Sequence, residues 1–385
     1  MATTGVAGDT RMDDRTRLRL FLAGDVMTGR GVDQILPHPS DPGLHEDYVK
    51  DARDYVRLAE RVSGPIARPV GFDYVWGEAL AQWQAYRPDL RLINLETSVT
   101  TSQYHWQWKG IHYRMHPDNV DCLAAAQPDC CLLANNHVLD WGYAGLMETL
   151  TTLYRARLSF AGAGANLEEA ARPARLTVPG KARVLVHAFA EGESGVPGSW
   201  AATADRAGIN RLRDLDGRTA DRIARSIAAE RDDGDIVVVS IHWGGNWGYD
   251  VPPAQRRFAH RLIDSGAVDL VFGHSSHHAR AIECYEGRLI IYGSGDFITD
   301  YEGIRGHEYY RPWLSPMYFV DLDPATGLLE RLQIVPLRLQ RFRLTAASAE
   351  DRSWLLEQLN RASRDFDTVL EPRDGALVVD ACATA

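Results

Sequence analysis

The chain has 385 residues, of which 45% are hydrophobic and 24% charged, so it can bury a large core as one large domain or two. Its formal net charge of -10, from 42 basic and 52 acidic residues, excludes the basic surface that nucleic acid or an anionic membrane attracts. We therefore predict a soluble globular protein that binds neither nucleic acid nor membrane.

The N-terminal segment MATTGVAGDTRMDDRTRLRL is polar and acidic, whereas a signal peptide needs a basic start and an apolar stretch of roughly 7–15 residues. No window approaches the roughly 18 apolar residues of a membrane span. The five cysteines are odd in number and lack CxxC spacing, which is typical of reduced thiols. We expect a cytoplasmic protein with a disordered tail over residues 1–15.

Short, apolar, β-branched runs recur along the chain, and each is followed at once by a polar or glycine-rich stretch. Continuous apolar runs are typical of strands that are covered on both faces in a layered α/β protein. The runs predicted as strands are, in chain order, 17–23, 90–95, 129–134, 235–241, 267–272 and 288–292.

Predicted helices alternate with these strands, at 221–230 and at 254–265, where Gly266 is a stop signal. One element departs from the alternation, because the runs 317–323 and 328–336 flank a short Pro-Ala-Thr-Gly turn and indicate a hairpin. A late helix over 350–364 indicates that residues 345–385 form a helical cover over an edge or face of the sheet.

The segment 37–77 is rich in Pro, Asp and Tyr and contains a predicted helix around 47–60. It is too long for a plain connection, so we predict a lid or a substrate-facing insert. No internal repeat or low-complexity linker divides the chain, which favours a single domain over residues 16–385 that includes this insert.

Oxygen and imidazole side chains follow the predicted strands at equivalent positions. Taken singly, each has a structural explanation: Asp25 as a helix cap, Glu96 as a surface charge, Asn136 as a turn residue, and His242 as a core histidine. Taken together they favour a metal site, because loops converge at the carboxyl edge of an α/β sheet. The residues concerned are Asp25, Glu96, Asn136, His137, His242, His274 and His277.

Six motifs in the order LAGDVMTGR, INLETSVT, LANNHVLDWG, SIHWGGNWG, GHSSHH and IIYGSGDF resemble the signature set of CapA-like proteins. That family is named for poly-gamma-glutamate capsule synthesis and belongs to the metallophosphoesterase superfamily. The resemblance covers residues 18–301. It implies an α/β fold, namely a layered β-sandwich flanked by helices, with one or two divalent ions at the carboxyl ends of the strands.

The resemblance also assigns roles to individual residues. Asp25 matches the first metal-binding aspartate, Glu96 stands where a bridging aspartate is usual, and Asn136 matches an asparagine ligand. His137 matches a histidine that touches substrate as an acid. The resemblance adds three histidine ligands, His242, His274 and His277.

The chain departs from the superfamily pattern at Met27, where a histidine usually stands two residues after the aspartate. The first metal position would then depend mainly on Asp25, Glu96 and His277, which favours one well-held ion, or one tight and one loose. This donor set is compatible with manganese, magnesium, calcium or zinc.

Such a site would either activate water for phosphoester hydrolysis or polarise a carbonyl and ease removal of the proton alpha to it. Many aromatic residues lie near the motifs, where their rings either plug the loops or contact a peptide with bulky side chains. Two cationic residues there would receive a terminal carboxylate. The expected substrate-binding residues are Trp106, Trp108, Lys109, Arg114, Trp243 and Trp247.

Capsule-synthesis members of the family are membrane-anchored, and this sequence shows no anchor. It is more similar to CapA-like peptide epimerases of lasso-peptide biosynthesis, which invert the C-terminal residue of a ribosomal precursor peptide. Epimerisation needs two proton-handling groups, for which we assign His137 together with either Asp25 or His307. His307 has the alternative of being an exposed loop residue, and Asp296 and Asp300 are expected to orient imidazoles.

Three alternatives remain open at this level. They are a phosphoesterase or a peptidase acting on gamma-glutamyl chains, a protein of capsule or poly-gamma-glutamate synthesis, and a binding protein that retains the fold without catalysis. The sequence does not determine the oligomeric state.

Overall fold

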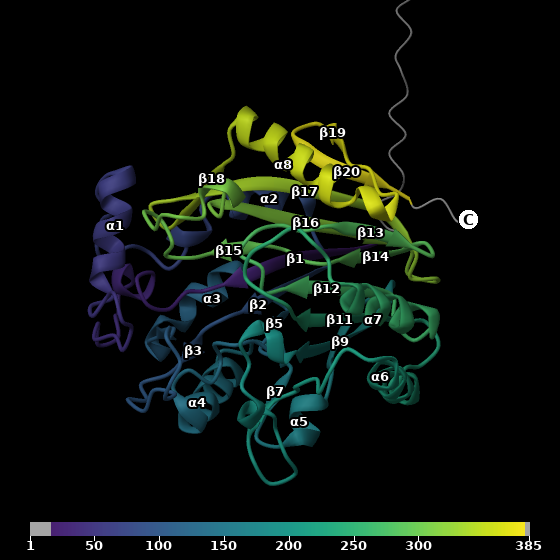
Figure 1. Cartoon of the computed structure of the whole chain (residues 1–385), viewed down its shortest axis with the longest axis horizontal. Helices are drawn as coiled ribbons and strands as arrows, with labels where there is room; N and C mark the ends of the chain where they lie inside the picture. Colours follow the sequence, from purple (N-terminus) through teal and green to yellow (C-terminus); the bar gives the residue numbers. More distant parts are fainter. Residues whose placement is uncertain (1–16, 382–385) are drawn as a thin grey trace, which may run out of the picture.

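The computed structural model describes residues 17–381. Two β-sheets pack face to face, and helices lie on their outer faces (Figure 1). The core between the sheets includes Leu22 from one sheet and Val186 and Val238 from the other. The predicted α/β sandwich flanked by helices is therefore confirmed. The tail expected over residues 1–15 lies outside the described residues.

The larger sheet has ten strands in the order β19-β20-β17-β16-β1-β2-β5-β6, with β15 beside β1 and β18 beside β17. It is mixed around β1, which pairs in parallel with β2 and β15 and antiparallel with β16. The bounds are β1 Leu18–Val26, β2 Leu90–Leu95, β5 Cys130–Leu132, β6 Phe160–Ala161, β15 Asp296–Ile298, β16 Leu314–Leu322, β17 Leu329–Gln340, β18 Arg343–Ala346, β19 Glu371–Arg373 and β20 Ala376–Asp380.

The smaller sheet has six strands in the order β13-β14-β12-β11-β9-β8. Side chains alternate along β11: Ile236 and Val238 face the core between the sheets, while Val237 and Val239 face the outer helices. Both faces are buried, which explains the continuous apolar run. The bounds are β8 Ala174–Val178, β9 Ala182–Ala190, β11 Asp235–His242, β12 Leu270–His274, β13 Ile282–Tyr285 and β14 Arg288–Ile291.

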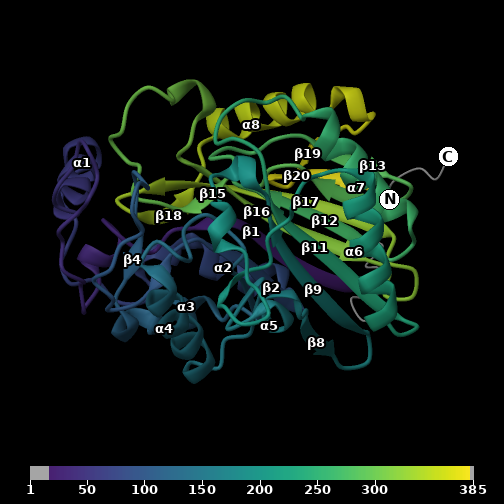
Figure 2. The same cartoon turned by 60° about the horizontal axis from the view of Figure 1, so that its bottom comes forward.

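Helices α6 and α7 pack on the outer face of the six-stranded sheet through residues such as Ile227 and Phe258. Helices α2, α3 and α4 lie on the opposite side of the sandwich (Figure 2). The bounds are α1 Arg53–Ser63, α2 Glu78–Tyr86, α3 Val120–Ala126, α4 Gly142–Arg155, α5 Leu167–Ala171, α6 Gly217–Glu230, α7 Pro253–Asp264 and α8 Ala349–Ala362. Two short pairs complete the fold, β3 Ser98–Val99 with β4 Arg114–Met115, and β7 Ala163–Gly164 with β10 Gly208–Ile209.

Local sequence explains where the predicted helices begin. The Asp216 carboxylate accepts the N–H of Thr219 and caps α6, whereas α7 begins at a proline, which suits a first turn that needs no N–H donor. The Ser348 hydroxyl accepts the N–H of Asp351 at the start of α8. All three predicted helices are confirmed, with small shifts at their ends.

The six predicted strands and the predicted hairpin, which is β16 with β17, are also confirmed. The sequence interpretation missed the β8–β9 hairpin and α4. It was wrong about part of the C-terminal cover, because after α8 the chain forms β19 and β20, and β20 pairs with β17. The first four residues of β20, Ala-Leu-Val-Val, are apolar and buried, and its two valines are β-branched residues that favour a strand.

The insert 37–77 contains α1, which stands at one side of the sandwich (Figure 1). Buried ionic contacts attach it to the rest of the chain. The Arg30 guanidinium donates to Asp300 and, at 2.9 Å, to Glu46 of the insert, and at 3.1 Å to the hydroxyl of Tyr55. The conformation described is thus an anchored one, and movement of the insert as a lid stays a prediction.

Cys122, Cys130 and Cys131 are buried free thiols, but Cys284 is disulfide-bonded. The expectation that all cysteines are reduced is therefore wrong for Cys284, and disulfides persist mainly in oxidising compartments. None of the helices within residues 17–381 combines the length and apolar character that a bilayer crossing requires.

Candidate metal centre

Strand register brings the predicted ligands together at the carboxyl edge of both sheets. In the ten-stranded sheet, Asp25 near the end of β1 lies opposite Asp296 of β15. In the six-stranded sheet, His242 at the end of β11 lies opposite His274 at the end of β12. All four side chains are buried. The centre is therefore built from both halves of the sandwich.

Two groups of side chains have ligand atoms within 4.8 Å of one another. The first is Asp25, His242 and His274. In it, Nδ1 of His242 lies 2.8 Å from Nδ1 of His274. At most one proton fits between two nitrogens at this distance. Two imidazoles that bind the same cation also direct ring nitrogens toward one point.

The second group is Asp25, His277 and Asp296. Asp296 Oδ1 lies 2.9 Å from Nδ1 of His277, so it orients the imidazole as the sequence predicted, and it also offers a ligand oxygen itself. This carboxylate supplies a third donor at the position that Met27 leaves without one. The residue shared by the two groups is Asp25, whereas the resemblance assigned bridging to Glu96.

Glu96 nevertheless lies within the cluster. The Asn94 side-chain amide donates to Oδ1 of Asp25 at 2.7 Å and to Oε2 of Glu96 at 3.0 Å, and thereby holds the two carboxylates side by side. Oε2 of Glu96 lies 4.0 Å from Nδ1 of His242. Asn136 is half-buried, and its Oδ1 has no hydrogen-bond partner among the described residues.

The unpartnered buried atoms fit a bound cation. Within residues 17–381, Oδ2 of Asp25, Oδ2 of Asp296, Nε2 of His242 and Oδ1 of Asn136 lack hydrogen-bond donors or acceptors. Each such atom costs about 1–3 kcal/mol when nothing satisfies it. All four can act as electron-pair donors to divalent ions, and Asp25 with His242 belongs to one ligand group and Asp25 with Asp296 to the other.

The pKa shifts of the ligand side chains also fit a bound cation. Burial, reinforced by Asp296, raises the pKa of Asp25 to about 7, and burial with Asp25 beside it raises the pKa of Glu96 well above its usual value. Burial lowers the pKa of His274 to about 3 and, together with His274, that of His242. A bound cation would stabilise the ionised carboxylates and the neutral His242 and His274, whereas Asp296 raises the pKa of His277 against the effect of burial.

His137 stands beside this cluster without belonging to either ligand group. Its Nδ1 lies 2.6 Å from Oδ2 of Asp140, and its Nε2 lies 3.8 Å from Oε1 of Glu96. The Lys109 ammonium lies 2.8 Å from Oδ1 of Asp140 and 2.9 Å from Nδ1 of His137. Burial lowers the pKa of His137 to about 4 against the opposing effect of Asp140. With Nδ1 directed at Asp140, Nε2 is the nitrogen free to exchange a proton.

His307 lies at the rim of the site. Its ring stacks on Trp247 with centroids 3.9 Å apart, and the Trp247 centroid is 5.4 Å from that of His277. Both residues are half-buried. The structure therefore places two of the predicted residues, His307 and Trp247, next to a metal-ligand histidine.

The other predicted substrate-binding residues differ in their exposure and in their contacts. Trp108 is fully exposed, and Trp106 packs edge-on against Trp200 with centroids 5.5 Å apart. Two expectations are corrected. Arg114 is buried, donates to backbone carbonyls and stacks on Trp141, and Trp243 has no exposed area and donates to the Tyr292 carbonyl. Both side chains are committed to internal contacts.

Asp300 also departs from expectation, because it pairs with the Arg30 guanidinium rather than with an imidazole. Two site residues were missed, Asn94 and Asp140. Each stands within a motif that already marks the site, Asn94 two residues before Glu96 and Asp140 three residues after His137. A polar residue inside an otherwise apolar strand run was the available signal for Asn94.

The chain is similar to several known proteins. The model of a family described as bacterial capsule synthesis protein PGA_cap matches residues 19–301. A relative named "Probable polyglutamine synthesis accessory protein" in Mycobacterium tuberculosis (strain H37Rv) is 51% identical over 348 residues, which is 90% of this chain and 91% of the relative. The capsule biosynthesis protein CapA of Bacillus anthracis is 24% identical over 351 residues, 90% of this chain and 74% of that protein. Among solved structures, a phosphatase from Mycoplasma pneumoniae aligns with a TM-score of 0.46 and 11% identity over 90% of this chain and 98% of its own.

Proposed function

This chain belongs to the PGA_cap family of bacterial capsule synthesis proteins, and on that premise we propose that it is a metal-dependent hydrolase of amide bonds in a glutamyl or glutaminyl polymer. The names of its relatives, which refer to polyglutamine and to capsule synthesis, support this polymer class. The observation that carries the proposal is a single proton-exchanging imidazole, His137, directed at a cluster of buried metal-ligand side chains.

Asp25, His242 and His274 would hold one divalent ion, and Asp25, His277 and Asp296 a second. A divalent ion bound there supplies Lewis acidity, which polarises a carbonyl and makes water a better nucleophile. Three imidazoles among the donors favour manganese or zinc over calcium and magnesium, which prefer oxygen ligands.

Because the lowered pKa keeps His137 neutral near pH 7, Nε2 would first take a proton from the attacking water and then give it to the departing amine, since amines leave poorly unless they are protonated. Asp140 fixes the ring through Nδ1, and Lys109 holds Asp140 in place. The carboxylate thereby orients the imidazole so that Nε2 faces Glu96 and the ligand cluster.

The cations near the centre favour a neutral amide over a phosphate ester. Arg30 is neutralised by Asp300 and Glu46, and Lys109 is paired with Asp140, so neither charge is free for a phosphate dianion.

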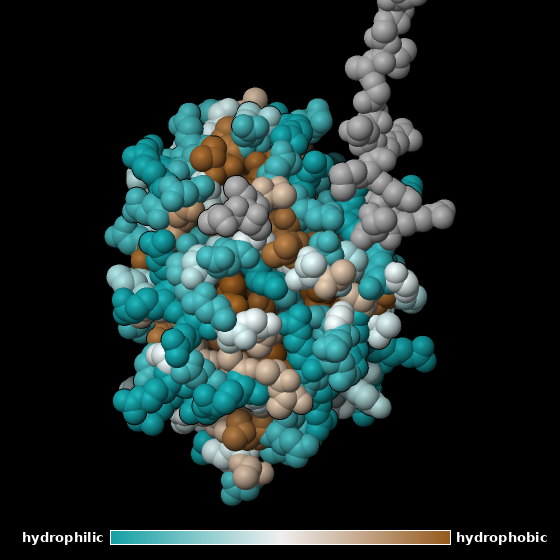
Figure 3. Space-filling view, turned by 90° about the vertical axis from the view of Figure 1, so that its right-hand side faces the viewer, coloured by the Kyte–Doolittle hydropathy of each residue, from teal (hydrophilic) through white to brown (hydrophobic). Residues whose placement is uncertain are grey.

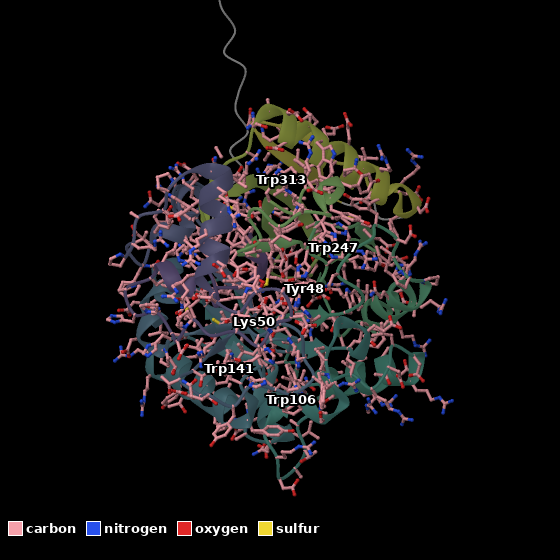
Figure 4. The ribbon with its side chains drawn as sticks, turned by 60° about the vertical axis from the view of Figure 1, so that its left-hand side comes forward. Tyr48, Lys50, Trp106, Trp141, Trp247 and Trp313 are labelled. Carbon is pink, nitrogen blue, oxygen red and sulfur yellow. The ribbon has the colours of Figure 1, made fainter. Side chains whose placement is uncertain are left out.

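Exposed aromatic side chains offer apolar contacts to a long substrate, and they include Tyr48, Tyr104, Trp108 and Tyr309. Figure 4 shows Tyr48 between Trp247 and Trp106 in projection.

The test is incubation of the manganese- or zinc-loaded protein with oligo-gamma-glutamate, oligo-alpha-glutamine and 4-nitrophenyl phosphate. We expect shorter oligomers by mass spectrometry and little release of 4-nitrophenol. Replacement His137→Gln should slow cleavage by about 10²- to 10⁴-fold, the usual contribution of a general acid. Release of 4-nitrophenol without cleavage of either oligomer would instead identify a phosphoesterase.

Epimerisation of a peptide alpha carbon, as in lasso-peptide biosynthesis, is a second candidate. It is favoured by one observation, the stacking of His307 on Trp247 beside His277, which adds a second imidazole at the rim of the site. His137 and His307 would then remove and return the proton on opposite faces of the carbon.

Incubation of peptides in heavy water separates the two candidates. Epimerisation adds one deuterium at the alpha carbon and leaves the peptide intact, whereas hydrolysis shortens it. His307→Ala should abolish deuterium incorporation if epimerisation occurs and should leave hydrolysis within about threefold of wild type, since His307 touches no residue of the His137 pair.

A further inference from the structure

A cavity of about 690 Å³ opens between the first turns of α6 and α7. Its lining includes Glu191, which follows β9, together with Asp216 at the start of α6 and Pro252 at the start of α7. Because α6 and α7 each precede a parallel strand, their first turns lie at the same carboxyl edge as the metal ligands. The surrounding face is mostly hydrophilic, with hydrophobic patches separated from one another (Figure 3).

Two buried polar side chains line this cavity and have unsatisfied atoms among the described residues. Gln255 is 1% exposed, and neither its side-chain oxygen nor its nitrogen has a hydrogen-bond partner. Glu191 is 9% exposed, and its Oε1 accepts the N–H of Glu193 while its Oε2 has no partner. A buried amide with both ends free is unusual, because buried polar groups are ordinarily satisfied.

The cavity is joined to the metal centre through the backbone of a ligand residue. The N–H of Glu191 donates to the His242 carbonyl at 2.9 Å, and the Ser194 hydroxyl donates to the same oxygen at 3.1 Å. Gln255 reaches the next turn of that loop, where a Cβ on Gly244 would lie 2.5 Å from its Nε2. The cavity wall therefore contacts the loop that follows β11 and begins at the ligand residue His242.

The free groups match a neutral amide. The Gln255 nitrogen and the first turn of α7, which no side chain caps, offer donors for a carbonyl oxygen. The Gln255 oxygen and Oε2 of Glu191 offer acceptors for N–H groups. The wall carries both charge signs, with Glu191, Glu193 and Asp214 facing the same space as Arg213 and Arg257, so neither an anion nor a cation is favoured.

We infer that this cavity is a subsite that binds a neutral amide group of the substrate, from a side-chain carboxamide or from a peptide bond of the chain. The inference rests on the proposed amide hydrolase for its substrate, and it adds that residues next to the cleaved bond are recognised through Gln255 and Glu191. A substrate without such groups leaves both side chains unpaired and loses affinity.

The experiment measures binding of hexaglutamine, hexaglutamate and hexaalanine to the metal-loaded protein by isothermal titration calorimetry. Gln255→Met keeps the volume of the side chain and removes the amide, and it should weaken hexaglutamine binding about tenfold. Gln358→Met is the matched control, because Gln358 is also a buried helical glutamine but lies on α8, away from the cavity. Gln255→Glu keeps the shape of the side chain and removes the amide N–H donors. It replaces the methionine variant in the experiment if that variant does not fold.

Each outcome separates the possibilities. If the wild type binds hexaglutamine more tightly than hexaalanine and the Gln255 variants lose this difference, the cavity is a carboxamide subsite. If the wild type binds both peptides equally and the Gln255 variants bind both more weakly, it is a peptide-bond subsite. Tightest binding of hexaglutamate, or Gln255 variants that bind like the Gln358 variant, overturns the inference. Hydrolysis is scored in parallel, so that absent cleavage with intact, Gln255-dependent binding counts against the proposed hydrolase alone.

Discussion

At the scale of single residues, Asp25 has the central position in the candidate metal centre. It belongs to both groups of ligand atoms, and its Oδ2 has no hydrogen-bond partner within residues 17–381. His242 and His274 belong only to one group, and His277 and Asp296 only to the other. Loss of Asp25 should therefore affect two ions, whereas loss of one histidine should affect one.

We predict that Asp25→Asn lowers metal affinity at both positions by at least about tenfold, while His242→Ala does so at one position and retains the other ion. Metal content after gel filtration, measured by inductively coupled plasma mass spectrometry, checks this. His260→Ala is the control, since His260 pairs with Glu283 outside the site. Equal metal content in the Asp25 variant and the wild type would contradict the assignment.

Lys109 acts through its contact with Asp140 and His137 rather than through metal. We predict that Lys109→Met lowers kcat about tenfold, because Asp140 loses a buried counter-charge and holds the imidazole less firmly. Metal content should stay unchanged. Lys50→Met removes a lysine of the insert that donates to the Glu46 carbonyl rather than to this pair, and it should retain full turnover. A Lys109 variant that loses metal would instead assign the lysine to the integrity of the centre.

At the scale of elements, the insert 37–77 is held by a buried ionic cluster. Arg30 is 3% exposed, and its guanidinium pairs with Asp300, which follows β15, and with Glu46 of the insert. The ring of Tyr55 in α1 stacks on this guanidinium, with 3.7 Å between the ring centroid and Cζ of Arg30. Cζ of Arg30 also lies 5.9 Å from the centroid of the Tyr301 ring. The Tyr301 hydroxyl in turn lies 3.5 Å from Nε2 of His277, so the ionic cluster adjoins the site. The insert and the metal centre therefore share structural support.

We predict that Glu46→Ala releases the insert and destabilises the protein by about 3 kcal/mol, the lower end for breaking a buried pair, because Asp300 still neutralises Arg30. Chymotrypsin should then cleave after Tyr55, which is 6% exposed in the intact fold. Fragment masses and urea unfolding measure the two effects. Asp54→Ala, which removes an exposed ion pair with Arg57 on the same helix, should change neither. Unchanged protection of Tyr55 in the Glu46 variant would show that α1 is held by other contacts.

At the scale of the whole molecule, the metal centre lies between the two sheets. Asp25 and Asp296 come from the ten-stranded sheet, and His242 and His274 come from the six-stranded sheet. An ion bound by both sets would cross-link the halves of the sandwich. Folding stability should therefore depend on metal as well as on the apolar core.

We predict that removal of metal with EDTA lowers the melting temperature, and that manganese or zinc at a hundred times its Kd restores about 2.7 kcal/mol of stability. Differential scanning calorimetry measures the shift. Asp25→Asn, which binds metal at least about tenfold more weakly, should gain no more than about 1.4 kcal/mol at the same metal concentration. A shift of equal size in that variant would mean that the ion acts elsewhere on the protein.

The sequence by itself determined the central strands that lead to the site, because a strand buried on both faces must be continuously apolar and cannot bury unpaired polar groups along its length. It therefore also identified Asp25, His242 and His274 as side chains at the sheet edge. It could not show that Asp25, rather than Glu96, is shared by the two ligand groups. That depends on the register between β1 and β15, which are far apart in the chain.

Only the tertiary structure decided which polar and aromatic side chains remain free. Lys109, Arg114 and Trp243 carry similar signals in the sequence, yet Lys109 faces His137 while Arg114 and Trp243 are committed to backbone carbonyls. The two aspartates after β14 separate in the same way, since Asp296 meets an imidazole and Asp300 a guanidinium. The physical reason is that burial and pairing are set by whichever distant segment packs against a side chain, and local sequence carries no record of that neighbour.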